Sequence, residues 1–141
     1  MIVGIVVVVV VVVMVVVVVI VMKSYKDLEV YQISFTLAIE VDVLSRKLPK
    51  SEFYELGSQV RRSAQSVRAN IVEGYGRRRY PADFIKFLFH AYASLLETIS
   101  HLEMLKSIYI ELNFNSLIKS YEKLGSKLHN FINFVETRWQ S

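Results

Sequence analysis

The sequence predicts an all-α protein, an antiparallel up-down-up-down four-helix bundle that follows an apolar poly-valine segment. Beyond Met22, apolar residues recur at spacings of three and four, which is the period of an amphipathic helix. Alternating patterns bounded by turn clusters, which would indicate strands, are absent from the sequence. Four helical stretches follow one another with short connections, and short connections favour antiparallel neighbours.

Composition divides the 141 residues into two parts, a poly-valine segment over residues 1–21 and the bundle over residues 22–141. Every charged side chain lies in the second part, so the net charge of +4 belongs to the bundle. A modest basic excess permits a nucleic-acid or acidic partner without requiring one. The absence of cysteine excludes disulfides, thiolate catalysis and zinc or iron–sulfur sites built from cysteine.

The first two predicted helices cover about residues 27–47 and 52–73. Pro49 prevents simple continuation of the first helix. Ser51 is the predicted N-cap of the second helix, and Gly74 is its predicted C-terminal residue. Their apolar faces consist of Leu28, Val30, Tyr31, Ile33, Phe35, Leu37, Ala38, Val41 and Leu44 in the first helix and Leu56, Val60, Ser63, Val67 and Ile71 in the second.

The third predicted helix covers about residues 81–110, with Pro81 in its first turn. Its apolar residues span an arc of roughly 200° at 100° per residue. A helix packed on one side of a bundle needs about half of that arc. The extra width favours contact with another subunit, and the alternative is a helix that lies centrally among three neighbours. The two stripes are Phe84, Leu88, Ala91, Leu95, Thr98, Leu102 and Leu105, and beside them Ile85, Phe89, Tyr92, Leu96 and Ile99.

The fourth predicted helix covers about residues 115–138. Its apolar positions keep a heptad-like spacing, which suits packing against antiparallel neighbours. They are Leu117, Tyr121, Leu124, Leu128, Phe131 and Val135.

Basic residues concentrate around the connection between the second and third helices. Guanidinium groups match phosphate geometry, so RNA or DNA is the ligand class that this pattern indicates. Tyr75 and Tyr80 flank the arginine run and could stack on bases. The alternative is a solvated loop whose arginines pair with carboxylates. The predicted nucleic-acid-binding residues are Arg61, Arg62, Arg68, Arg77, Arg78, Arg79 and Lys86.

Three residues near the end of the second helix have a predicted structural role. Asn70 lies near the apolar edge, where a buried amide must find partners, and we expect it to tie the helix end to a neighbouring backbone. Glu73 is expected to pair with an arginine of the following loop, and Gly74 to end the helix.

No catalytic site, metal site or cofactor site is predicted. Di-iron bundles use Glu-x-x-His motifs, and the nearest approach here is Glu97 to His101, which is one residue too long. Phosphate-binding glycine loops and dinucleotide fingerprints are absent from the sequence. We therefore expect the protein not to be an enzyme.

Three segments resemble the bacterial four-helix-bundle proteins known as 23S ribosomal RNA intervening-sequence proteins. The segments are "YKDLEVYQISFTLAIEV", "LGSQVRRSAQSVRANIVEGYGRR" and "FIKFLFHAYASLLETISHLEML". The similarity is carried by residues 25–109 and is expected to extend over the rest of the bundle. Small departures occur at Arg68, Val72 and Ala93, where relatives commonly have proline, alanine and glycine.

This resemblance implies a four-helix bundle that assembles as a ring-like homopentamer. It also implies an origin in reading frames inside insertions of ribosomal RNA genes. A related accessory protein of diversity-generating retroelements works with a reverse transcriptase and nucleic acid. The expected function is therefore that of a non-enzymatic, oligomeric protein that binds RNA or DNA. The alternative is a protein–protein interaction scaffold or an accessory subunit of a nucleic-acid enzyme.

The poly-valine segment has two interpretations. Its 21 residues, 15 of them valine, would span about 30 Å as a helix, which is enough to cross a bilayer. Lys23 and Lys26 follow, so the bundle would then lie in the cytoplasm. The favoured alternative is translation from Met22, because natural membrane spans rarely repeat one residue type. We expect a cytoplasmic protein, membrane-anchored only if residues 1–21 are translated.

Overall fold

The computed structural model describes residues 1–21 and 23–139, with side chains for residues 1–16 and 23–139. Every regular element of this part of the chain is helical, as predicted. The elements are α1 (Ile2–Val21), the 3₁₀ helix η1 (Tyr25–Asp27), α2 (Glu29–Ser45), α3 (Lys50–Tyr54), α4 (Leu56–Gly76), α5 (Pro81–Ile108) and α6 (Asn115–Arg138).

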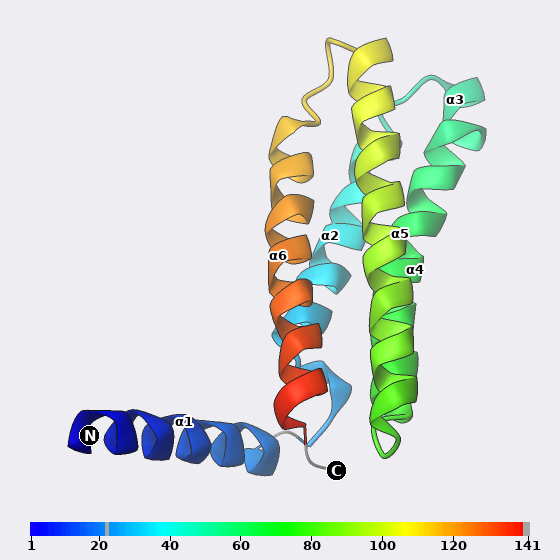
Figure 1. The fold of residues 1–141 in the computed structure, drawn as a ribbon. Coiled ribbons are helices and arrows are strands. Elements are labelled where there is room, and N and C mark those ends of the chain that lie inside the picture. Colours follow the sequence, from blue (N-terminus) through cyan, green and yellow to red (C-terminus); the bar gives the residue numbers. More distant parts are fainter. Residues whose placement is uncertain (22, 140–141) are drawn as a thin grey trace.

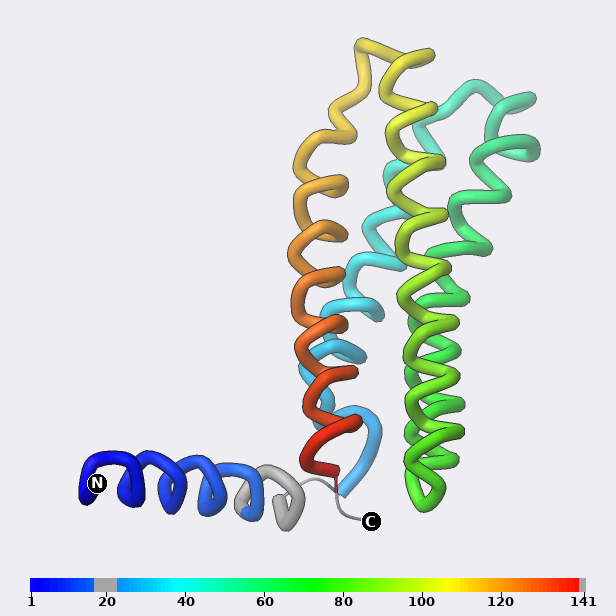
Figure 2. The backbone as a smooth tube through the Cα atoms, viewed as in Figure 1, coloured from blue at the N-terminus to red at the C-terminus, as the bar shows by residue number. Residues whose placement is uncertain are grey.

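The four long helices α2, α4, α5 and α6 pack side by side around one core. α4 contacts α2 and α5, and α6 contacts α5 and α2, so the four helices close into a ring of neighbours. Successive helices run in opposite directions (Figure 1). Figure 2 shows that the α4–α5 connection, the entry into α2 and the end of α6 lie at the same end of the molecule. The other two connections lie at the opposite end.

The core is built from apolar side chains that recur along each helix at spacings of three and four residues. On α5, the predicted stripe from Phe84 to Leu105 is buried at every position. On α6, Tyr121, Leu124 and Leu128 are fully buried. Burial of such side chains supplies the main stabilising contribution, at about 25 cal/mol for each Å² of apolar surface removed from water.

Helix boundaries differ most from the prediction between α2 and α4. The predicted second helix is divided at Glu55, whose backbone (φ −95°, ψ −104°) is not helical. The first piece, α3, begins directly after Pro49, so Ser51 lies inside the helix and is not its N-cap. A Cβ at Gly57 would lie 3.0 Å from the Glu52 carbonyl oxygen, so glycine allows the chain to fold tightly at this corner.

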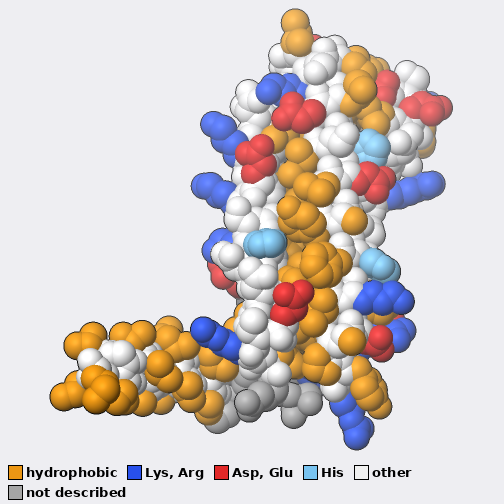
Figure 3. Space-filling view, viewed as in Figure 1, with side chains coloured by type: hydrophobic (Ala, Val, Ile, Leu, Met, Phe, Trp, Pro, Cys, Tyr) orange, Lys and Arg blue, Asp and Glu red, His pale blue; other side chains and the backbone are white. Residues whose placement is uncertain are grey.

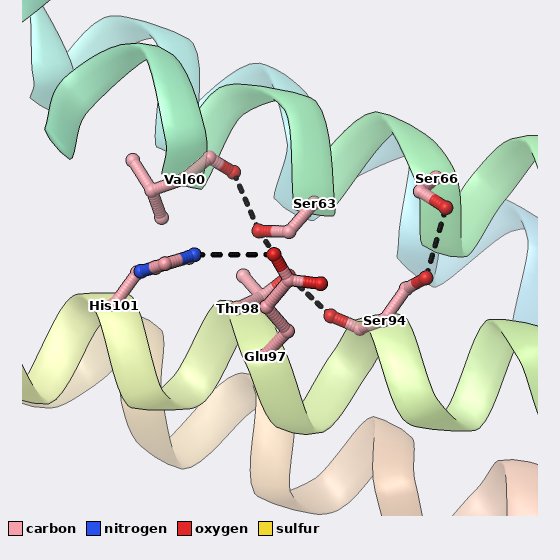
Figure 4. A network of polar contacts seen from close by, with 7 residues as sticks. All are labelled: Val60, Ser63, Ser66, Ser94, Glu97, Thr98 and His101. Atoms are coloured by element: carbon pink, nitrogen blue, oxygen red, sulfur yellow. Dashed lines mark hydrogen bonds and ion pairs between the residues drawn. The ribbon is translucent and has the colours of Figure 1, made fainter. Parts of the chain in front are cut away.

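Hydroxyl groups link α4 to α5 inside the interface (Figure 4). Thr98 Oγ1 lies 2.9 Å from Ser63 Oγ, and both side chains are buried. Ser63 donates to the carbonyl of Val60 at 3.1 Å. One turn away, Ser66 Oγ and Ser94 Oγ are 2.8 Å apart. These contacts satisfy polar groups that would otherwise be buried at a cost.

Helix α1 extends away from the four long helices (Figure 1). Its side chains from Ile2 to Val10 are exposed. Across the residues that the structure describes, no helix combines the length and the hydropathy needed to cross a membrane. The predicted span of residues 1–21 includes residues 17–21, whose side chains lie outside the described part. The division of the chain at residue 22, which also lies outside it, remains a prediction.

Tyr121 generates a prediction about stability at high pH. Its hydroxyl is buried without a hydrogen-bond partner among the described residues. Burial, and secondarily the charge of Glu40, raises the pKa of Tyr121. The unfolded chain loses this proton near pH 10, whereas the folded chain retains it. The free energy of unfolding therefore falls as pH rises above about 10, by up to about 1.4 kcal/mol per pH unit from this group.

Urea denaturation at pH 8 and pH 11 measures this effect. Between pH 8 and pH 11, the free energy of unfolding of Tyr121→Phe should fall less than that of the wild type. At pH 8 the variant should be about as stable as the wild type, because the substitution removes a buried polar group that lacks a partner. Tyr54→Phe, at a tyrosine that is 65% exposed, is the control. Equal pH dependence in the wild type and Tyr121→Phe would contradict the assignment.

Candidate nucleic-acid interface

The predicted basic residues do not all lie in one place, because some of them are distributed along α4. Arg77, Arg78 and Arg79 lie in the α4–α5 connection, and Lys86 lies in the second turn of α5. Arg61 lies near the start of α4, about 24 Å away along the helix axis at 1.5 Å per residue. Arg62 shares that distant end, and Arg68 lies between the two ends. The structure therefore brings four of the seven residues together.

Residues 77–80, which we call the arginine loop, have a hydrogen-bonded backbone. The amides of Arg77 and Arg78 donate to the carbonyls of Gly74 and Tyr75 at 3.0 and 3.1 Å. The Tyr80 amide donates to the Arg77 carbonyl at 2.9 Å. Pro81 then begins α5, as predicted. The loop thus presents its side chains from a defined backbone.

Gly74 has a different role from the predicted one. Helix α4 continues through it to Gly76, and Gly74 is buried. Among the described residues, no glycine has a positive φ angle. A Cβ at Gly74 would lie 3.1 Å from Phe87 Cβ and 3.2 Å from Phe84 Cδ1. Glycine is therefore needed here for the close approach of α4 and α5, immediately before the arginine loop.

Two arginines of the loop have partners within the chain. Arg77 Nη2 lies 3.0 Å from Glu73 Oε1, so the predicted pairing of Glu73 with a loop arginine is confirmed. Both side chains are about half exposed, at 48% and 52%, and such a pair contributes at most about 1 kcal/mol. Arg78 donates to the Tyr75 carbonyl at 3.1 Å and lies 4.2 Å from the centroid of the Tyr75 ring. Each guanidinium remains accessible to an anion.

Arg79 and Lys86 are exposed. Within residues 23–139, neither side chain takes part in a hydrogen bond or an ion pair, in contrast to Arg77 and Arg78. These two cations therefore have all of their donors available to a ligand.

The two tyrosines that flank the arginine run differ in exposure. Tyr75 is only 7% exposed and packs edge-on against Tyr25, with ring centroids 6.5 Å apart. Tyr75 is therefore a core residue. Because Arg78 also covers its ring, Tyr75 has no free face for a base. Tyr80 is 62% exposed. Only Tyr80 retains the stacking role that was expected of both.

Arg61 belongs to the corner formed by α2, α3 and α4. Its guanidinium donates to Ser45 Oγ and to the Phe53 carbonyl, each at 3.0 Å, and it lies 3.8 Å from the centroid of the Phe53 ring. These contacts use both terminal nitrogens. Arg61 therefore joins the three helices, and its geometry does not favour the phosphate contact predicted for it.

Arg68 and Asn70 have contacts inside α4. Arg68 donates to Gln65 Oε1 from Nε and Nη2, at 3.1 and 3.0 Å. Asn70 donates to the Ser66 carbonyl at 2.8 Å and to Ser66 Oγ at 3.0 Å. The expected bond from Asn70 to a neighbouring backbone is therefore replaced by a bond to its own helix, and Ser66 continues the contact to Ser94 on α5.

Sequence reasoning missed three further cations at this end of the molecule. Lys23 precedes η1 and Lys26 lies within it, η1 contacts α4, and Arg138 is the last residue of α6. Figure 2 shows the entry into α2 and the end of α6 at the same end as the arginine loop. The predicted up-down-up-down order could have indicated them, because it places the start of the first bundle helix and the end of the last one at the same end as the connection between the second and third.

No group of three or more metal-ligating side chains occurs among the described residues. His101 Nε2 lies 3.3 Å from Glu97 Oε1, as a pair one helical turn apart. These are the two residues that came nearest to a di-iron motif in the sequence.

The part of the chain that carries this site matches the sequence profile of a known protein family. The profile described as "23S rRNA-intervening sequence protein" matches residues 26–130, which run from η1 into α6. The chain belongs to this family. The resemblance that three sequence segments indicated is thus confirmed. A comparison with curated proteins found no match to the chain.

Arg61 generates a prediction about stability. Arg61→Met removes two hydrogen bonds and a cation–π contact but retains much of the packing, so we expect the free energy of unfolding to fall by about 1–3 kcal/mol. Arg62→Met, at the exposed neighbouring position, is the matched control and should change it by less than about 0.5 kcal/mol. Urea denaturation measures both. Similar stability of the two variants would exclude Arg61 as a structural joint.

Proposed function

We propose that this protein is a non-enzymatic, cytoplasmic four-helix-bundle protein that assembles into an oligomer and binds RNA or DNA through phosphate contacts. The observation that carries the proposal is the gathering of exposed cations at one end of the bundle. Arg77, Arg78, Arg79 and Lys86 share that end, and Arg79 and Lys86 have no side-chain partner among the described residues. Such a surface neutralises phosphates with little dependence on base sequence.

The charge balance of the whole end supports this proposal. Segments 23–27, 73–86 and 136–138 contain seven basic and four acidic residues. Asp27 accepts hydrogen bonds from the amides of Lys23 and Ser24, and Glu73 pairs with Arg77, so two of the four acidic groups already have partners. The basic residues are Lys23, Lys26, Arg77, Arg78, Arg79, Lys86 and Arg138.

Exposed apolar residues support assembly. On α5, Phe89 and Leu96 are 48% and 51% exposed. Leu96 lines a groove of about 530 Å³ between α5 and α6, together with Leu95 and Gly125. Figure 3 shows the hydrophobic strip along this face. Part of the wide apolar arc predicted for this helix is therefore left uncovered by the residues that the structure describes.

A second apolar line lies on α2, at Phe35, Ile39 and Val43. Two different apolar surfaces on one subunit suit a head-to-tail contact, in which the α5 face of one copy packs on the α2 face of the next. Such contacts close into a ring when the rotation between copies allows it. The homopentamer implied by the family resemblance is the ring that we propose.

Ring assembly would strengthen a weak ligand contact. Each copy would contribute one arginine-loop end, and symmetry would place equivalent ends on the same face of the ring. Several linked contacts to one polyanion raise the overall affinity well beyond that of a single end.

A protein–protein scaffold, or an accessory subunit of a nucleic-acid enzyme, is the second candidate function. The observation that favours it is the same uncovered α5–α6 groove, which a helix of another protein could occupy. Recovery of one protein partner after nuclease treatment would support this candidate. A partner lost on nuclease treatment would favour binding through nucleic acid.

The arginine loop generates a prediction about binding. Replacing Arg77, Arg78 and Arg79 by alanine should weaken binding of a labelled oligonucleotide by about tenfold or more at low salt. The slope of log affinity against log salt should become shallower by about two to three, because three phosphate contacts are lost. Fluorescence anisotropy across a salt series measures both quantities.

The matched control replaces Lys47, Lys50 and Lys119 by alanine, which removes the same charge from the opposite end. All three lysines are exposed. This variant should retain most of the affinity, and circular dichroism should show unchanged helix content in both. Equal losses in the two triple variants would show that net charge alone determines binding, and would refute a site at the arginine loop.

The apolar face generates a prediction about assembly. Leu96→Glu places a charge in the proposed contact, so the oligomer should dissociate to smaller species in light scattering coupled to size-exclusion chromatography. His90→Glu is the control, because His90 lies about 120° around α5 from Leu96 at 100° per residue. An oligomer that survives Leu96→Glu, or a wild type that is monomeric, would refute this interface.

A further inference from the structure

Tyr80 is the one residue of the arginine loop that combines an anchored backbone with a free aromatic ring. Its amide donates to the Arg77 carbonyl at 2.9 Å, and its carbonyl accepts from the Phe84 amide at 3.1 Å. Pro81 follows and restricts the backbone further. The ring itself is 62% exposed. An exposed ring on a fixed backbone is an aromatic surface that loses little conformational entropy when a ligand covers it.

The other aromatic rings at this end are already engaged. Tyr25 packs edge-on against Tyr31, with ring centroids 4.9 Å apart, and Tyr75 lies beneath Arg78. Trp139 packs edge-on against Phe84 at 5.0 Å. Within residues 23–139, Tyr80 takes part in no such aromatic or cation–π contact, in contrast to these neighbours. It is therefore the ring at this end that is free to accept a planar partner.

The chemistry around Tyr80 specifies that partner. Arg79 precedes it in the chain, is exposed and has no ion pair within residues 23–139, so a phosphate beside a stacked base would meet a cation. A tyrosine ring stacks on a base only where neighbouring bases do not cover its face, which is the case in single strands, loops and ends. In a duplex, only the terminal pairs expose a face.

We propose that Tyr80 is a base-stacking residue, and that the arginine-loop end therefore binds single-stranded nucleic acid in preference to duplex. The inference rests on the proposed function, because it assumes that the arginine loop binds phosphates. To the proposed function it adds that the nucleic acid is single-stranded and that Tyr80 is the residue that selects single strands. Arginine contacts alone would bind single strands and duplexes through the same phosphate chemistry.

The test compares Tyr80→Ser and Tyr80→Phe with the wild type. Tyr80 is the N-cap of α5 and makes no side-chain capping bond, and serine is a favoured N-cap residue, so Tyr80→Ser should fold. Tyr80→Phe retains the ring and should bind like the wild type. Tyr54→Ser, at an equally exposed tyrosine of α3, is the control.

The probes are fluorescein-labelled oligo(U), oligo(dT) and a hairpin duplex with the same number of phosphates, each measured by anisotropy at one salt concentration. We expect the wild type to prefer both single strands over the duplex. Tyr80→Ser should weaken single-strand binding by about tenfold and leave duplex binding almost unchanged. The comparison of oligo(U) with oligo(dT) distinguishes RNA from DNA as the source of the strand.

Two results overturn the inference in different ways. Equal binding of duplex and single strands, or single-strand binding that is unchanged in Tyr80→Ser but weakened by alanine at the arginine loop, refutes stacking and leaves the proposed function intact. Absence of binding to every probe refutes the proposed function and the inference together.

Discussion

The close packing of α4 on α5 is the constraint on which the candidate site depends. Gly74 allows the two helices to approach at a point where a Cβ would lie only 3.1 Å from Phe87 Cβ and 3.2 Å from Phe84 Cδ1. That approach leaves room for only a short connection, and the connection is the arginine loop. The site is therefore a direct consequence of a helix contact, since a wider separation would require a longer and more mobile loop that spreads the same charges.

Long amphipathic elements were predictable because their periodicity is a local property of the chain. The bounds of α6 agree with the prediction at both ends, and the first of the two stripes predicted for α5 is the buried one. The break at Glu55 was not predictable, because it depends on how α3 packs at a corner and not on the residue itself. The role of Gly74 was missed for the same reason, since glycine near a helix end is typical of a C-terminal cap.

The candidate site shows the same division between local and tertiary information. The arginine run and the pairing of Glu73 with Arg77 are local and were predicted. The covering of Tyr75 by Arg78, and the contacts of Arg61 with Ser45 and Phe53, depend on neighbouring helices. An arginine run identifies a basic region, whereas only the packed structure separates the cations that hold the fold together from those that are free to meet a ligand.

The paired hydroxyls between α4 and α5 have a consequence for the folding of this helical hairpin. Leucine and alanine stripes tolerate sliding, because one apolar turn resembles the next. A displacement of one turn would separate Ser63 from Thr98 and Ser66 from Ser94, and each interhelical hydrogen bond that is not replaced would cost about 0.5–1.5 kcal/mol. The two pairs thus favour one alignment of the helices over its neighbours, and that alignment is the one in which Gly74 lies against Phe87.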